Sequence, residues 1–442
     1  MTTPTPAANQ SPDITKLKAY LINLISRELE TNPPDPKDRR MAVMKLLELA
    51  YQSTKLQLAN TIREQLFQDI LDEMLGYGPI QSLLDDENVS EIMVNNPKKI
   101  YVERKGKLQK TKITFEDEDA VVRVIDRIIL PLGRRVDHDR PMVDARLPDG
   151  SRVNAIVRPI AIDGPGITIR KFQKERLGVE DLIKFGSLTE FMADFLRACV
   201  VSRLNLVISG GTGSGKTTLL NILSSFIPEN ERIITIEDAA ELQLQQDHVL
   251  RMETKPSDLD GKNEVAIRDL VKNSLRMRPD RIVIGECRGG EALDMLQAMN
   301  TGHDGSLTTL HANTPRDAIS RLETMCLMSG VNLPLKVIRQ QIASAVDVIV
   351  QQSRLRDGSR KVTSITEVAG MEGDMIIMTE IFRFEQTGMS EDDKVLGELK
   401  PSGIRPLFMP RLEASGFKLS PAVFGADISS ILQPRNNSGR RR

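Results

Sequence analysis

The N-terminal part of the chain has the hydrophobic pattern of helices. From Ile14 to Glu30, apolar residues recur every three or four positions, which is typical of a helix with one buried face. A second helical pattern begins near Met41 and continues to about Leu75. We therefore expect residues 14–75 to form a small helical bundle with a packing or docking role.

A different pattern begins after the turn residues at 76–79. Short runs of β-type composition and one helical run predict elements at 91–94, 99–103, 110–115, 118–130, 152–157 and 166–170. Strands mixed with a single helix in this way predict an α+β domain over residues 76–175.

From Gly186 onward, apolar strands alternate with helical runs. Strand-like segments occur at 205–209, 232–236, 281–284 and 307–310. This alternation is typical of a parallel sheet with helices on both faces, so we predict an α/β domain over 180–385. Residues 386–442 are predicted to be a loosely attached, partly disordered extension, and residues 1–13 to be disordered.

The composition excludes several classes of protein. With 442 residues, of which 40% are hydrophobic, the chain has room for about three domains with real cores. Its formal net charge of −1 and its lack of tryptophan disfavour a nucleic-acid binder that works by base stacking. The three cysteines form no C-x-x-C pair, which argues against disulfides or zinc and favours a reducing cytosol.

The sequence also lacks membrane and secretion signals. Its first thirteen residues contain no basic residue and no apolar run, so they do not resemble a secretory signal. No run of about eighteen apolar residues could cross a bilayer. We therefore expect any membrane association to come from a partner.

A glycine-rich motif follows the first strand of the predicted α/β domain. It matches the phosphate-binding pattern G-x-x-x-x-G-K-[ST] and comprises Gly210, Gly211, Thr212, Gly213, Ser214, Gly215, Lys216, Thr217 and Thr218. The glycines let backbone N–H groups point at phosphate oxygens, and the following helix adds its positive N-terminus. Lys216 is predicted to neutralise the terminal phosphates of ATP, and the hydroxyl of Thr217 to bind Mg²⁺ directly.

Carboxylates follow the next two predicted strands. Glu237, Asp238 and Glu241 lie where a parallel sheet opens onto its ligand, with helix capping as the alternative for Asp238. Glu286 lies where a phosphoryl-transfer enzyme places the group that orients or deprotonates the attacking water. Gly285 stands where many such strands carry a metal-directed aspartate, so we expect Glu286 to reach Mg²⁺ through water.

Two histidines lie near the fourth predicted strand. His311 and Asn313 follow that strand, whereas His303 lies in the glycine-rich turn before it. A histidine with only a structural role is the alternative for both. Zinc is not expected, because the other histidines have no cysteine or carboxylate cluster at ligand spacing.

Arginines are concentrated in residues 134–170. An arginine placed against a transferring phosphoryl group can raise the rate greatly and need not belong to the same subunit. The candidates are Arg134, Arg135, Arg140, Arg146, Arg152, Arg158 and Arg170.

Taken in order, these motifs resemble those of the type II/type IV secretion ATPase superfamily of bacteria and archaea. The matching segments are the loop at 210–218, IEDAAEL at 236–242, RPDRIVIGECRGGEA at 278–292 and GHDGSLTTLHANTP at 302–315. Upstream, LGYGPIQSLLDDENVSEIMVN and PMVDARLPDGSRVNA look like segments of the tight-adherence (Flp) pilus ATPases of the CpaF type. The resemblance is strongest from about Leu75 to Met328.

The resemblance implies a fold and a set of roles. ATP and Mg²⁺ would lie between an α+β, PAS-like N-terminal domain and a RecA-like C-terminal domain, in a homo-hexameric ring. The implied site consists of the catalytic Glu286, an acidic box of Glu237, Asp238 and Glu241, a histidine box of His303, His311 and Asn313, and phosphate-binding arginines, with Arg152 best placed and Arg134, Arg135 and Arg146 behind it. The tetracysteine zinc element of the type II secretion and pilus-extension motors is absent.

The implied function is that of a motor. ATP hydrolysis would drive pilin assembly or protein secretion through an inner-membrane platform protein, with the chain cytoplasmic and peripheral at that membrane. A type IV secretion or retraction motor of the same superfamily is the nearest alternative. A ring NTPase that translocates nucleic acid and a nucleotide-gated scaffold that does not hydrolyse ATP are the others.

Overall fold

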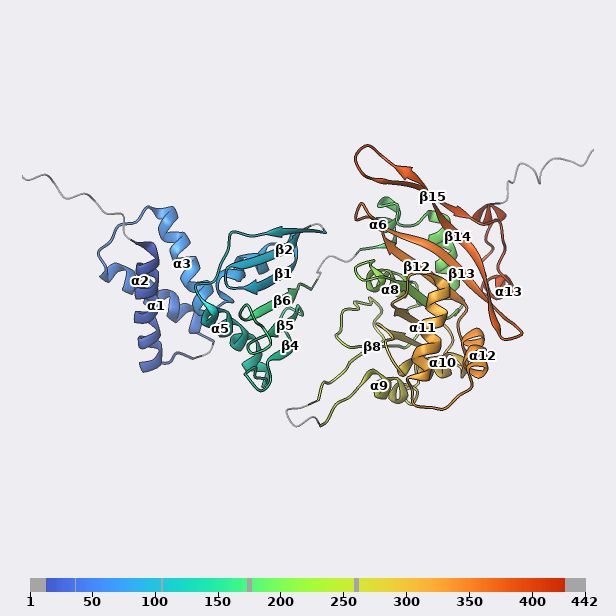
Figure 1. The fold of residues 1–442 in the computed structure, drawn as a ribbon, viewed down its shortest axis with the longest axis horizontal. Coiled ribbons are helices and arrows are strands. Elements are labelled where there is room, and N and C mark those ends of the chain that lie inside the picture. The colour runs from blue at the N-terminus through green and yellow to red at the C-terminus, as the bar shows by residue number, and fades with distance from the viewer. Residues whose placement is uncertain (1–12, 36, 105, 173–176, 258–261, 426–442) are drawn as a thin grey trace, which may run out of the picture. The chain divides into compact units, whose positions relative to one another are not determined.

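The structure is a computed structural model, drawn as a ribbon in Figure 1. It describes residues 13–35, 37–104, 106–172, 177–257 and 262–425. The chain divides into two compact units, Met1–Lys174 and Glu175–Arg442, and each unit is described by itself. The segment 1–13, for which the sequence predicts disorder, lies outside the described residues apart from Asp13.

Three helices begin the first unit, namely α1 Ile14–Thr31, α2 Arg39–Ser53 and α3 Asn60–Met74. The side chain of Asp13 caps α1 by accepting a hydrogen bond from the N–H of Lys16. Their apolar faces meet in one core that contains Leu21, Ile25, Leu47, Leu66 and Ile70. The single helical pattern predicted from Met41 to about Leu75 is divided into two helices. The break between them contains Lys55, whose φ of 54° is left-handed and does not continue a helix.

A six-stranded antiparallel sheet follows the helices. Its strands are β1 Val89–Asn96, β2 Lys99–Arg104, β3 Lys107–Lys110, β4 Met142–Arg146, β5 Arg152–Ile156 and β6 Gly166–Arg170. Their order in the sheet is β3-β2-β1-β6-β5-β4. Helix α5, Glu118–Ile129, packs on this sheet, since Val121 and Ile125 share a core with Ile92 and Ile169. The short helices of this region are η1 Gly78–Ile80, α4 Gln81–Asp85 and η2 Leu130–Leu132.

Two strands of this sheet differ from the sequence expectation. The strand predicted at 110–115 is wrong, because β2 and β3 form a hairpin whose turn contains Gly106, with φ of 75°, and β3 pairs directly after it. Strand β4 is not predicted at all. Its sequence, MVDAR, contains charged residues that interrupt the alternation of apolar and polar positions. The segment is a strand because it pairs with β5.

The second unit is built on a nine-stranded sheet. Its strands are β7 Leu206–Gly210, β8 Ile233–Glu237, β9 Val249–Glu253, β10 Arg281–Ile284, β11 Leu307–Leu310, β12 Val348–Arg354, β13 Arg360–Glu372, β14 Met375–Met389 and β15 Val395–Pro401. The order is β15-β14-β13-β12-β7-β11-β10-β8-β9. From β12 to β9 the neighbours are parallel, whereas β13, β14 and β15 are antiparallel additions. The carboxyl ends of the parallel strands therefore share one edge.

Helices cover both faces of this sheet (Figure 1). They are α6 Val179–Lys184, α7 Glu190–Val201, α8 Lys216–Ser224, α9 Ile267–Ser274, α10 Glu291–Asn300, α11 Pro315–Leu327 and α12 Leu335–Ala345. Leu206 and Ile208 of β7 share a core with α7 and α8, whereas Val207 shares a core with α9 to α12. The predicted α/β fold class is confirmed. Among the described residues, no helix is both long and apolar enough to span a bilayer.

The described part of the C-terminal segment is packed onto the second unit. Helix α13, Met409–Ala414, and η3, Pro421–Phe424, contribute Leu412 and Phe424 to the core shared by α7 and α8. The expectation of a loosely attached end is therefore wrong for residues 386–425, because β14 and β15 pair in the sheet and Met409, Leu412, Val423 and Phe424 are buried in this core. Residues 426–442, part of the predicted disordered tail, lie outside the described residues.

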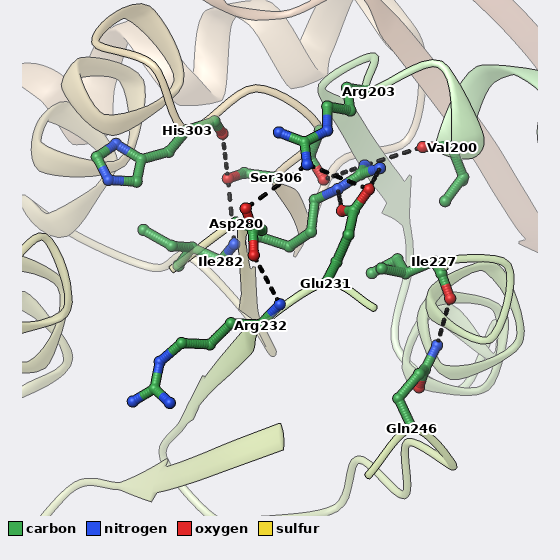
Figure 2. Close-up of polar contacts among 12 residues, drawn as sticks. Val200, Arg203, Ile227, Glu231, Arg232, Gln246, Asp280, Ile282, His303 and Ser306 are labelled. Carbon is green, nitrogen blue, oxygen red and sulfur yellow. Dashed lines mark hydrogen bonds and ion pairs between the residues drawn. The ribbon is translucent and has the colours of Figure 1, made fainter. Parts of the chain in front are cut away.

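A buried charge cluster lies where the parallel strands begin (Figure 2). Arg281, the first residue of β10, is fully buried and forms an ion pair with Glu231. Its guanidinium also donates to the carbonyl oxygens of Val200, at 2.9 Å, and Gly305, at 3.1 Å. Arg203 adds an outer ion pair to Glu231, at 3.2 Å. One arginine thus ties together the end of α7 and the segments before β8 and β11.

Candidate functional site

The phosphate-binding motif connects β7 to α8. Gly213 and Gly215 have φ angles of 69° and 96°, which favour glycine. Gly210 has no room for a side chain, because a Cβ atom there would lie 2.3 Å from the carbonyl oxygen of Gln352 on β12. Helix α8 begins at Lys216, so its first-turn N–H groups, which have no acceptor within the helix, face the loop.

The side chain of Lys216 is turned into the site and is only 8% exposed. Its Nζ atom donates a hydrogen bond to the carbonyl oxygen of Gly211, at 3.2 Å. Nζ also lies 3.4 Å from Nε2 of His311 and 4.0 Å from Oε1 of Glu286. The loop lysine, the predicted histidine and the predicted catalytic glutamate therefore meet at one point.

Sheet topology explains this convergence. Strands β7, β11 and β10 are consecutive neighbours, and Lys216, His311 and Glu286 each follow the carboxyl end of one of them. Nε2 of His311 lies 2.8 Å from Oε1 of Glu286. The hydroxyl of Thr309 donates to the carbonyl oxygen of Gly285, at 2.7 Å, and so fixes the ends of β11 and β10 to each other.

The protonation state of His311 follows from its surroundings. Partial burial lowers the pKa of His311 below 6.5, the positive charges of Lys216 and Arg288 lower it further, and the Glu286 carboxylate opposes them. A neutral imidazole is therefore favoured at pH 7. In the tautomer with a proton on Nε2, the ring donates a hydrogen bond to Oε1 of Glu286.

Glu237 has a local structural contact at the end of β8. Its Oε2 atom accepts hydrogen bonds from the N–H groups of Glu241, at 2.8 Å, and Leu242, at 3.0 Å. The side chain is buried, and this burial raises the pKa of Glu237 although the two N–H groups oppose the shift. Glu237 thus shapes the acidic loop, and its catalytic role stays a prediction.

The same carboxylate explains why residue 285 is a glycine. A Cβ atom at Gly285 would lie 2.9 Å from Cγ of Glu237. An aspartate there would displace Glu237 and the loop that it holds. Among the described residues, no group of three His, Cys, Asp or Glu side chains is arranged to hold a metal ion. Thr217, in the first turn of α8, and Glu286 remain the predicted Mg²⁺ contacts.

Arg288 is a site residue that the sequence analysis did not single out. Its Nε atom donates to Oε2 of Glu286 at 2.6 Å, and Nη1 donates to Oδ2 of Asp238 at 3.2 Å. Asp238 is therefore an ion-pair partner rather than a helix cap. The motif GECRGG held a signal, because Arg288 follows Glu286 by two positions, but the sequence does not show where its side chain points.

Arg360 is a second such residue and has no local sequence signal. It begins β13, and its Nε atom donates to the carbonyl oxygen of Gly213, at 3.0 Å. Its Cδ atom would lie 3.2 Å from a Cβ atom at Gly215. The β12–β13 hairpin thus supports the phosphate-binding loop from the same unit.

The histidine box is divided by strand β11. Asn313 lies near the site edge, where its carbonyl oxygen accepts a hydrogen bond from Nε2 of Gln351, at 3.1 Å. His303 lies at the other end of β11, where its carbonyl oxygen accepts from the Ser306 hydroxyl, at 2.8 Å (Figure 2). The structure therefore does not bring His303 to Glu286, because the four-residue strand separates them.

The predicted phosphate-binding arginines belong to the first unit. Arg146 on β4 and Arg152 on β5 are paired across the two strands, and Arg170 on β6 is the next partner of Arg152. Three arginines therefore lie side by side on the face that does not carry the buried Val153 and Ala155. Such a row of like charges suits an anion.

Two further candidates lie in the loop before β4. A guanidinium nitrogen of Arg134 donates to the carbonyl oxygen of Asp144, and Arg135 forms an ion pair with Asp137, at 3.1 Å. Arg158 is held by Glu118, with a shortest contact of 2.8 Å. A role for any of these arginines at the nucleotide stays a prediction.

Comparison with known proteins identifies the family. Residues 73–383 match the family described as type II/IV secretion system protein, which is more than half of the chain. The chain therefore belongs to this family, as the motifs predict.

Relatives of known name agree with this assignment. A protein of Mycobacterium tuberculosis named for conjugal transfer is 34% identical over 333 residues, which is 74% of this chain and 94% of the relative. The conjugal transfer protein TrbB of Rhizobium radiobacter is 36% identical, over 66% of this chain and 86% of the relative. The crystal structure of the VirB11 ATPase from the Brucella suis type IV secretion system is 30% identical, covers 65% of this chain and 94% of that chain, and has a TM-score of 0.36.

Proposed function

We propose that this chain is a Mg²⁺-dependent ATPase that works as a motor in a bacterial or archaeal envelope machine. The observation that carries the proposal is the convergence of Lys216, Glu286 and His311 at the mouth of a phosphate-binding loop. The carboxylate of Glu286 lies at the position where a group that activates water would meet the terminal phosphate. This arrangement supports hydrolysis rather than nucleotide binding alone.

Each site residue has a separate role in ATP binding and hydrolysis. The first-turn N–H groups of α8 and Lys216 bind the terminal phosphates, and the hydroxyl of Thr217 is placed to bind Mg²⁺. A Mg²⁺ ion held there would supply positive charge against the negative charge that develops on the phosphoryl group. Glu286 orients and deprotonates the attacking water, with neutral His311 holding its carboxylate in place. Arg152 and Arg146, with Arg134 and Arg135, are the candidates to complete the phosphate charge from the first unit.

At the level of biological role, we propose the homo-hexameric motor of a tight-adherence (Flp) pilus. It would be cytoplasmic and peripheral at the inner membrane, where a platform protein would convert its movements into filament growth. The upstream segments that look like the CpaF type support this choice. The relatives named for conjugal transfer support the second candidate, a secretion motor of the same family.

Hydrolysis is tested with two substitutions in the full chain. We expect Glu286→Gln to keep nucleotide affinity and to lower ATPase activity by a factor of about 10² to 10⁴, as for loss of a general base. Lys216→Ala should weaken nucleotide binding itself. Phosphate release measured against Mg²⁺ concentration, with particle mass from light scattering, gives activity and assembly together. Unchanged activity in Glu286→Gln would show that the catalytic assignment is wrong.

The remaining alternatives predict other results. A nucleotide-gated scaffold would bind ATP and release no phosphate. A motor that translocates nucleic acid would show ATPase activity that rises on addition of single-stranded or duplex DNA. We expect phosphate release, and no stimulation by either DNA.

A further inference from the structure

Arg288 occupies a central position in the site, where it contacts both Glu286 and Asp238. It lies in the loop between β10 and α10, and Oε1 of Glu291 accepts from its backbone N–H, at 2.6 Å. The backbone is thereby fixed, whereas the side chain is 58% exposed and reaches back across the site to Glu286 and Asp238. A fixed backbone with an exposed, long side chain allows the guanidinium to change partners without moving the loop.

In this arrangement both oxygens of Glu286 are occupied. Oε1 lies 2.8 Å from Nε2 of His311 and 4.0 Å from Nζ of Lys216, and Oε2 accepts from Nε of Arg288 at 2.6 Å. Arg288 therefore holds Oε2, the one oxygen of Glu286 that His311 and Lys216 do not contact. While it does so, it competes with an attacking water for that oxygen.

A bound nucleoside triphosphate would compete for Arg288. In a phosphate-binding loop the lysine contacts the β- and γ-phosphates, so the terminal phosphate lies next to Lys216 and hence next to Glu286. The guanidinium of Arg288 is already bonded to that glutamate. A terminal phosphate offers several anionic oxygens and can accept two parallel hydrogen bonds from one arginine, so it can compete for Arg288 with Glu286, at 2.6 Å, and Asp238, at 3.2 Å.

We propose that Arg288 exchanges partners, leaving Glu286 and Asp238 for the terminal phosphate of a bound nucleoside triphosphate. The exchange releases Oε2 of Glu286 for the attacking water. Glu286 thus becomes available as the base only when a γ-phosphate is present. With a nucleoside diphosphate, Arg288 stays bonded to Glu286. The inference rests on the proposed function, since it requires a nucleotide on the 210–218 loop.

The exchange is tested by comparing two nucleotides. The affinities of a non-hydrolysable ATP analogue and of ADP are measured on the full chain, with Mg²⁺, by titration calorimetry. We expect Arg288→Ala to weaken binding of the ATP analogue about tenfold, which corresponds to about 1.4 kcal/mol, and to change ADP affinity less than about twofold. Arg276→Ala is the matched control, because Arg276 is exposed at the other end of β10 and donates to the carbonyl oxygen of Lys272.

The outcomes separate this inference from the proposed function. The exchange is overturned if Arg288→Ala has the same ratio of ATP-analogue affinity to ADP affinity as the unsubstituted protein. This holds whether both affinities fall or neither does. If Lys216→Ala leaves both affinities unchanged, the proposed nucleotide site itself is wrong. Should Arg288→Ala not fold, Arg288→Lys serves in its place, because lysine keeps the charge but cannot donate two parallel bonds. Arg288→Lys should lower the ratio of ATP-analogue affinity to ADP affinity by less than the tenfold expected for Arg288→Ala. An unchanged ratio in Arg288→Lys also overturns the exchange.

Discussion

Nε2 of His311 lies 2.8 Å from Oε1 of Glu286, although 25 positions of sequence number separate the two residues. Each follows the end of a strand, and the two strands are parallel neighbours. The contact is therefore a direct product of the sheet topology. It joins a titratable group to the predicted catalytic base, and this gives the site a dependence on pH.

We expect ATPase activity to fall in acid as His311 gains a proton. Burial and nearby cations lower the pKa of His311 below 6.5, so its imidazole is mainly neutral at pH 7 and gains its proton in more acidic solution. The charged ring would hold Glu286 in an ion pair and compete with the attacking water for its carboxylate. The rate constant kcat, measured from about pH 5 to 8, should decline with a midpoint below the ordinary histidine value.

His311→Gln is the matched variant for this profile. Glutamine keeps a hydrogen-bond donor near Glu286 but does not titrate. Its activity should stay level over the range in which the unsubstituted protein declines. An identical decline in both proteins would assign the titration to another group.

Arg360→Ala should weaken binding of ATP and ADP to the same extent. Its Nε atom donates to the carbonyl oxygen of Gly213, so its loss frees the back of the phosphate-binding loop without removing a phosphate contact. Loss of one charge-assisted hydrogen bond predicts a decrease of about tenfold or somewhat more for each nucleotide. Arg356→Ala, in the exposed turn of the same hairpin, is the control. A selective loss of ATP affinity in Arg360→Ala would contradict this loop-supporting role.

Part of the site could be predicted from the sequence because strand ends converge. Lys216, Glu286 and His311 each follow a short apolar strand, and parallel strands bring their carboxyl ends to one edge. His303 could not be placed in this way. The motif contains it, but it precedes β11 by a few residues, and a four-residue strand is enough to put it at the far edge.

Arg288 and Arg360 show what the sequence could not supply. Arg288 lies inside a recognised motif, yet only its contacts to Glu286 and Asp238 give it a role. Arg360 reaches the phosphate-binding loop because β12 pairs with β7 and β13 pairs with β12. The pairing of β12 with β7 joins residues far apart in the sequence, and no local motif predicts it. The C-terminal helix α13 is a similar case, since its apolar residues Met409 and Leu412 are buried in a core built by elements distant in sequence, including α7 and α8.

Gly285→Ala should lower ATPase activity at least tenfold with a modest loss of stability. Its Cβ atom would lie 2.9 Å from Cγ of Glu237, so that side chain must shift, and the adjacent Glu286 would shift with the backbone. Small displacements of reacting groups cost large factors in rate. Gly388→Ala is the control, because a Cβ atom there meets nothing within 4 Å. Normal activity in Gly285→Ala would show that this contact does not position Glu286.

Arg281→Met should destabilise the second unit by about 3–5 kcal/mol, since it leaves Glu231 as a buried carboxylate without its main partner. The fully buried guanidinium also donates to the carbonyl oxygens of Val200 and Gly305. The measurement is urea unfolding of the full chain followed by circular dichroism. Arg203→Ala, which removes a 43% exposed arginine from the same glutamate, should cost less than about 1 kcal/mol.

The double variant Arg281→Met with Glu231→Gln separates charge from packing. If the unpaired carboxylate causes the loss, neutralising Glu231 should restore part of the stability that Arg281→Met removes, and the two effects should not add. Strictly additive effects would show that Arg281 acts through its bonds to Val200 and Gly305 instead. In either case the cluster lies at the edge opposite Glu286, so the ATP-binding affinity of the folded variant should stay within about twofold of the unsubstituted protein.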